Sequence, residues 1–122
     1  MKDPKLANGN ADPKQQPVKQ PRPSGPLHEL EVPIEKRDTV ASARLESDGD
    51  AAWQSNRMDE AREKYLDAWV LNPTAELALK LGEIHYQRDE TAEAKAWWTR
   101  HLKEQSSSKA AIYINTVLPH GE

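Results

Sequence analysis

The sequence predicts an all-α fold in which antiparallel helix pairs repeat as an α-solenoid of about five helices, after a disordered N-terminal tail. Two observations support this prediction. Residues 34–122 hold all four Trp and all three Tyr, are rich in Ala, Glu, Leu, Lys and Arg, and contain proline only at positions 73 and 119. That composition is typical of a helical domain. The same region carries an internal repeat, in which the sequence around Gly49 returns around Gly82, as it does in arrays of helix pairs.

Residues 1–33 have a different composition. They hold seven of the nine prolines and none of the Trp or Tyr residues. A segment so poor in apolar side chains cannot offset its backbone entropy by burial, so we expect residues 1–33 to be a disordered or polyproline-like tail. Residues 1–26 carry five basic and two acidic side chains, which makes this tail mildly basic. The PxxP spacing of Pro23 and Pro26 favours a linker over an SH3 ligand, because the basic residue beside it is out of place.

Capping residues place the helices of domain 34–122 in order. The first helix should begin near Pro33 or Asp38 and end near Gln54. Asn56 is a suitable N-cap for a second helix that runs to about Leu71.

Three further helices follow from the same signals. Pro73 stops the second helix, and Thr74 can cap a third. Asp89 can cap a fourth, which fades into the serines at 106–108. Those serines can cap a fifth helix that ends just before Pro119.

When the chain is slid against itself so that Gly82 falls on Gly49, several other special positions align in register. Glycine in the middle of a helix costs about 1 kcal/mol relative to alanine, so a repeated glycine indicates a close approach between two helices. A small residue on the second helix of each pair, followed one turn later by a large aromatic residue, would fill the remaining gap. The matched pairs are Gly49 with Gly82, Trp53 with Tyr86, Ala61 with Ala94, Tyr65 with Trp98, and Trp69 with Leu102.

With these residues in this order, the sequence resembles the tetratricopeptide repeat (TPR) family. The resemblance implies units at about 42–74 and 75–107, followed by a capping helix at about 107–118. Asp48 stands where the family usually has Leu, so we expect the first helix to be an exposed end of the stack. A looser resemblance is to the short TPR segments of bacterial, notably myxobacterial, multidomain proteins, which often follow a Pro-rich linker.

The resemblance also implies a concave face lined by the first helix of each pair. This face would be acidic, with Lys80 as its only basic residue, which argues against a clamp for a C-terminal carboxylate. A basic or apolar peptide anchored on Trp53 and Tyr86 fits better. Packing is an equally open role for those two aromatic residues, and the acids can be an ordinary solvated face. The candidate residues are Glu46, Asp50, Trp53, Gln54, Glu76, Leu79, Lys80, Glu83, Tyr86, Ile112 and Tyr113.

Several classes of function find no support. There is no Cys, no Gly-rich phosphate loop and no catalytic motif, so we expect neither an enzyme nor a cofactor. His85 and His101 can begin a metal site, but ordinary packing is the favoured interpretation. A formal net charge of −3 does not favour nucleic acid. The longest apolar run is too short to insert into a membrane, and we expect a cytoplasmic location, or a periplasmic one if an anchor precedes this chain.

The expected function is therefore a non-catalytic protein–protein interaction module that binds a peptide or partner protein on its concave face, as an adaptor or scaffold. The alternative is a structural segment of a larger bacterial multidomain assembly that docks in cis or self-associates, with a homodimer as one form. Two units are fewer than the three that a stable stack usually needs, which favours contacts beyond this chain.

Overall fold

The computed structural model describes residues 22–23, 25–105 and 109–117, and this part of the chain is helical and without strands. The predicted all-α class, with five α-helices, is confirmed. The elements in order are the short 3-10 helices η1 (Leu27–Glu29) and η2 (Ile34–Lys36), then α1 (Thr39–Gln54), α2 (Met58–Leu71), α3 (Ala75–Gln87), α4 (Thr91–Glu104) and α5 (Lys109–Val117).

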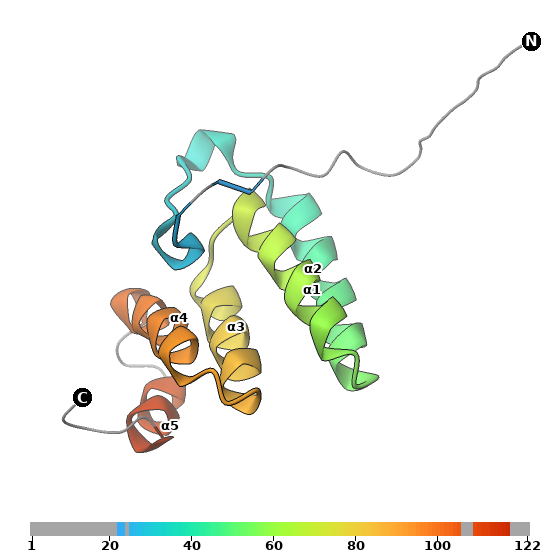
Figure 1. Ribbon diagram of the computed structural model, residues 1–122. Coiled ribbons are helices and arrows are strands. Elements are labelled where there is room, and N and C mark those ends of the chain that lie inside the picture. Colours follow the sequence, from blue (N-terminus) through green and yellow to red (C-terminus); the bar gives the residue numbers. More distant parts are fainter. Residues whose placement is uncertain (1–21, 24, 106–108, 118–122) are drawn as a thin grey trace, which may run out of the picture.

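The helices form two antiparallel pairs and a final single helix. Figure 1 shows α1 and α2 lying side by side, α3 and α4 forming the second pair, and α5 beyond it. Short turns at 55–57, 72–74 and 88–90 connect successive helices, and such turns force neighbouring helices to run antiparallel. No described helix is both long enough and apolar enough to cross a membrane.

Of the predicted N-caps, Thr74 is confirmed and two are wrong, and the first helix begins after Asp38, one of its two expected starting points. The side chain of Asp38 accepts a hydrogen bond from the Ala41 amide, and that of Thr74 accepts one from the Leu77 amide. Asn56 and Asp89 are not N-caps: both have a left-handed backbone, with φ of 65° and 62°. They follow the ends of α1 and α3, where a left-handed residue closes the last helical turn. The predicted serine cap at 106–108 and the end near Pro119 lie outside the described residues.

The repeated glycines are points of close helix contact. A Cβ added to Gly49 would lie 2.6 Å from the Tyr65 ring, and one added to Gly82 would lie 2.3 Å from the Trp98 ring. Tyr65 and Trp98 are themselves fully buried. The sequence prediction for both pairs, glycine on the first helix and a packed aromatic ring on the second, is confirmed.

One core joins the two pairs. Residues from α1 to α4 share a buried cluster, in which the rings of Trp69 on α2 and Trp97 on α4 meet edge to face with centroids 5.0 Å apart. A second cluster of Ala94, Trp98 and Ile114 attaches α5 to the second pair. The helices are therefore a continuous stack rather than two separate hairpins.

The described residues of the segment 22–37, namely 22–23 and 25–37, lie against this stack and are called the N-terminal strap. The Trp69 Nε1–H donates to the Leu27 carbonyl at 2.7 Å, and Leu27 and Leu30 pack on the first core cluster. The prediction of a disordered tail up to residue 33 is therefore wrong for its described part. Apolar residues spaced three apart allow one 3-10 turn to place two leucines on the same surface. Residues 1–21 lie outside the described part of the chain.

Candidate functional site

Part of the predicted concave face comes together where α3 faces α1. The Lys80 ammonium donates to Glu46 Oε2 at 2.8 Å and to Asp50 Oδ1 at 2.9 Å. This contact, the Lys80 bridge, joins the first helices of the two pairs. It also neutralises part of the acidic charge that the sequence places on this face.

The Lys80 bridge is half-buried, and its electrostatics reflect that. Burial lowers the pKa of the Lys80 ammonium, but hydrogen bonds and charges from Glu46 and Asp50 outweigh this effect, so that the pKa is raised. The Tyr65 hydroxyl donates to Asp50, and burial together with this bond raises the pKa of the Tyr65 phenol. Both groups are held in their protonated forms.

Trp53 lies at the edge of an open pocket. Its ring is half-buried and meets the Tyr65 ring edge to face at 6.0 Å. The pocket has a volume of about 260 Å³ and is lined by Asp50, Trp53, Gln54 and Tyr65. Four residues from two helices thus form a concave surface that includes a half-buried indole and one carboxylate.

The second pair presents a similar arrangement. Tyr86 is half-buried against Trp98, with ring centroids 5.3 Å apart, and the Tyr113 ring from α5 meets Trp98 edge to face at 5.8 Å. The Tyr113 hydroxyl donates to Glu83 at 3.1 Å. A carboxylate therefore stands one helical turn before a half-exposed aromatic ring in both pairs, Asp50 before Trp53 and Glu83 before Tyr86.

Three predicted residues take no part in these contacts. Leu79 packs in the second core cluster, and its carbonyl accepts a bond from Trp98 Nε1, so it is a packing residue. Glu76 is exposed in the first turn of α3, and Ile112 is 73% exposed on α5. Four carboxylates and one ammonium, with a formal sum of −3, leave the predicted face acidic.

The two helical histidines have separate partners. His85 Nδ1 lies 2.7 Å from Glu90, while His101 Nδ1 lies 2.8 Å from the Ala75 carbonyl. The hydrogen bond from His85 lowers the pKa of the Glu90 carboxyl. Over the described ranges, no group of three or more His, Cys, Asp or Glu side chains could hold a metal ion.

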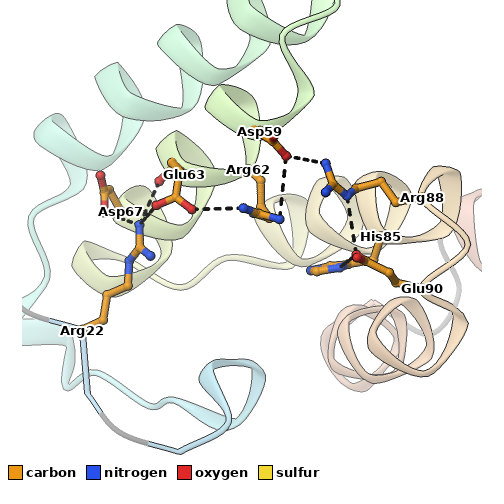
Figure 2. Close-up of polar contacts among 8 residues, drawn as sticks. All are labelled: Arg22, Asp59, Arg62, Glu63, Asp67, His85, Arg88 and Glu90. Carbon is orange, nitrogen blue, oxygen red and sulfur yellow. Dashed lines mark hydrogen bonds and ion pairs between the residues drawn. The ribbon is translucent and has the colours of Figure 1, made fainter.

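Sequence reasoning missed a chain of ion pairs that links the strap to the turn between α3 and α4. Figure 2 shows acidic and basic side chains alternating along α2 and then crossing to that turn. The i,i+3 and i,i+4 spacing of charges on α2 was a visible signal, but the partners on the strap and on α3 were not. Its members are Arg22, Asp67, Glu63, Arg62, Asp59, Arg88, Glu90 and His85.

Sequence reasoning also missed the residues that hold the strap. Arg100 on α4 is 6% exposed, and its Nη1 donates to the carbonyls of His28 and Leu30 at 2.8 and 2.9 Å. Its guanidinium lies over the Trp69 ring, 4.8 Å from the centroid. No local pattern reveals this site, because the hydrogen-bonded residues are 70 or more positions apart in the chain.

Comparison with known proteins gives one informative match. No family model and no solved structure matches the chain. A curated protein, the serine/threonine-protein kinase pkn3 of Myxococcus xanthus, is 37% identical over 98 residues, which are 79% of this chain and 18% of that protein. Because the match covers 79% of the chain, it includes α1, α2 and α3 wherever in the chain it begins. The chain thus spans under a fifth of that relative's length.

Proposed function

We propose that this chain is a non-catalytic protein-interaction module of TPR type, which binds a basic peptide or a basic segment of a partner protein on its concave face. One observation carries the proposal: a carboxylate followed one turn later by a half-exposed aromatic ring occurs at equivalent places in both pairs. These are Asp50 with Trp53 and Glu83 with Tyr86.

The chemistry of this pair suits Lys or Arg side chains. An aromatic face attracts a cation, and a carboxylate one turn away can accept its hydrogen bonds. Two such places, one on the first helix of each pair, would read two basic residues of one ligand. The surplus of three negative charges would speed the encounter with a basic partner. An adaptor or scaffold works in this way, by presenting a rigid surface without chemistry of its own.

Selection of peptides from a random display library tests the proposal. We expect the selected peptides to be enriched in Lys and Arg. A chain carrying Glu76→Lys and Glu83→Lys should bind them at least tenfold more weakly, because both changes reverse charge on the concave face. Isothermal titration of synthetic versions measures the affinities.

A matched control separates the concave face from overall charge. Glu35→Lys and Glu93→Lys make the same change in net charge at exposed positions on η2 and α4, and should leave the affinity within about twofold. Peptides that bind the concave variant as well as the natural chain would contradict the proposal.

A second candidate is a structural segment of a larger bacterial multidomain protein, docking in cis or self-associating. The match to a short part of a much longer relative favours it. The exposed large apolar residues of the described chain also lie near the two ends of the stack, namely Ile34 and Val40 at one and Ile112 and Tyr113 at the other. Sedimentation equilibrium over a hundredfold range of concentration tests self-association, and a constant monomer mass would count against it.

We also propose that this chain has no catalytic activity and is located in the cytoplasm. The relative is named as a serine/threonine-protein kinase, and the match covers 18% of that protein. Incubation of the chain with ATP and a general protein substrate should show no phosphate transfer above background. Fractionation of the source cells checks the location.

A further inference from the structure

The strap lies in a groove that recognises it mainly through its backbone. We define the strap groove by five residues, Glu63, Asp67 and Trp69 on α2 with Trp97 and Arg100 on α4. Trp69 and Arg100 supply three hydrogen bonds of 2.7 to 2.9 Å, and all three are accepted by backbone carbonyls of the strap. Backbone carbonyls are common to every peptide, so these bonds do not depend on the strap's own sequence.

Strap side chains also contact the groove and its rim. The His28 ring meets the Trp97 ring edge to face at 6.1 Å, and Glu31 pairs with Arg100 and Lys103 at 3.6 and 3.9 Å. The closest side-chain contacts are at two other places. Arg22 Nη2 donates to Glu63 at 2.7 Å and to Asp67 at 2.9 Å, and the hydrogen bond from Arg22 lowers the pKa of the Glu63 carboxyl. Farther along the strap, Leu27 and Leu30 pack on the core cluster that holds Trp69 and Trp97. The groove therefore reads a basic residue followed by a Leu-x-x-Leu pair.

The strap covers its groove without being built into the core. Neither η1 nor η2 contains a buried residue. An open cavity of about 550 Å³ lies between the strap and α4, lined by His28, Glu29, Glu31, Ala96, Thr99, Arg100 and Lys103. The hydrogen-bond donors of the strap groove, in contrast, are buried: Trp69 is fully buried and Arg100 nearly so. Buried donors need an acceptor, which the strap supplies here; if the strap leaves, water or the carbonyls of another peptide can take its place.

We propose that the strap groove is a second protein-binding site, occupied at rest by the chain's own strap. Its ligand in trans is an extended segment of another protein with the same chemistry, a basic residue followed at the spacing of Arg22, Leu27 and Leu30 by two leucines or similar apolar residues. The groove is formed by α2 and α4, whereas the acidic concave face is formed by α1, α3 and α5. Apart from Tyr65 of α2, which lines the pocket at Trp53, the two sites use different helices, and a ligand of the groove must displace the strap.

The test uses the full chain and a synthetic peptide of residues 22–31 with a fluorescent label. A tethered strap competes at an effective concentration in the millimolar range, so the natural chain should bind this peptide weakly. Leu27→Ser with Leu30→Ser weakens the strap and leaves the groove intact. Fluorescence anisotropy should then show at least tenfold tighter binding of the peptide.

Two controls identify the groove as the site. Adding Arg100→Gln to the strap-weakened chain removes a donor to two carbonyls and should abolish the gain, while Arg44→Gln on the exposed side of α1 should preserve it. A labelled peptide with serine in place of both leucines should not bind. A strap-weakened chain that keeps its helicity but binds the peptide no better than the natural chain would overturn the proposal, and so would loss of helicity, since the strap would then belong to the core.

Hydrogen exchange in the natural chain gives a second test that needs no substitution. If the strap opens by itself, the Trp69 Nε1–H should exchange at least tenfold faster than the slowest backbone amides of α2 and α3. An indole proton that exchanges only with global unfolding would overturn the proposal.

Discussion

Gly49 and Gly82 set the distance between the helices of each pair. Each faces an aromatic ring from the partner helix at a separation that leaves no room for a Cβ atom. Their equivalent places in the two units explain why the period is so regular, since each unit repeats the same glycine-to-ring contact. The cost of glycine within a helix, about 1 kcal/mol relative to alanine, is thus offset by the burial of a large ring.

Gly82→Ala should destabilise the chain by about 1–3 kcal/mol, because the new methyl group would displace the Trp98 ring in a closely packed site. A glycine on an open helix surface would show the opposite sign, since alanine is the better helix former. Urea unfolding followed by circular dichroism measures the change.

The double variant with Trp98→Leu identifies the cause of this loss. With the ring removed, Gly82→Ala should become neutral or stabilising. If Gly82→Ala raises the stability of the natural chain, the close contact is not a constraint on the fold.

At the scale of elements, α1 and α3 are each followed by a residue with a left-handed backbone. Asn56 and Asp89 are separated by the same period as the two glycines, and both turn the chain with a left-handed backbone. Asn tolerates this conformation better than most residues, Asp does so less well, and glycine adopts it without a steric penalty. The turns between the helices of a pair are thus repeated as faithfully as the helices.

Replacing these residues by glycine should stabilise the chain. We expect about 0.5 kcal/mol from Asn56→Gly and up to about 1 kcal/mol from Asp89→Gly, because the strain of the left-handed backbone disappears. Thermal unfolding measures both. The matched control is Ala92→Gly within the first turn of α4, which should destabilise; a loss of stability in all three variants would contradict the assignment.

The sequence predicted local features of the elements well. Thr74 was recognised as a cap, and Asp38 as one of two possible starts of the first helix, because the bond of each is made to an amide only three positions along the chain. Asn56 and Asp89 were misread because the same residue types suit an N-cap and a left-handed turn. Which of the two roles such a residue takes depends on where the preceding helix ends, and composition does not determine that position.

Features that depend on distant residues were not predictable. The strap was read as a free tail because its prolines dominate its composition, while Arg100, its main anchor, lies far along the chain on α4. On the concave face, the choice of residues followed from the repeat, but the Lys80 bridge did not. That bridge requires the distance between α1 and α3, and only the packing of the two pairs fixes this distance.

At the scale of the whole molecule, stability should fall as pH rises above about 10. The ordinary pKa values are 10.0 for Tyr65 and 10.5 for Lys80, and both are raised in the folded chain. Above these values the unfolded chain releases two protons that the folded chain retains. Stability from these groups is therefore complete below pH 10 and is lost as pH rises, by at most about 1.4 kcal/mol per pH unit for each group.

Urea unfolding between pH 8 and 11 checks this dependence. Tyr65→Phe with Lys80→Met should flatten the alkaline slope, whereas Lys109→Met at an exposed position on α5 should leave it unchanged. A slope that stays the same in the double variant would show that other groups cause the loss.

The Lys80 bridge has a mechanical consequence. The two helix pairs are joined by the short turn that holds the buried Pro73 and by the core contact between Trp69 and Trp97. Lys80 adds a half-buried ion pair between α3 and α1 at the face proposed to bind a ligand. A basic ligand that offers its own cation to Asp50 or Glu46 would compete with this ion pair. Under the proposed function, binding would therefore change the contact between the two helix pairs.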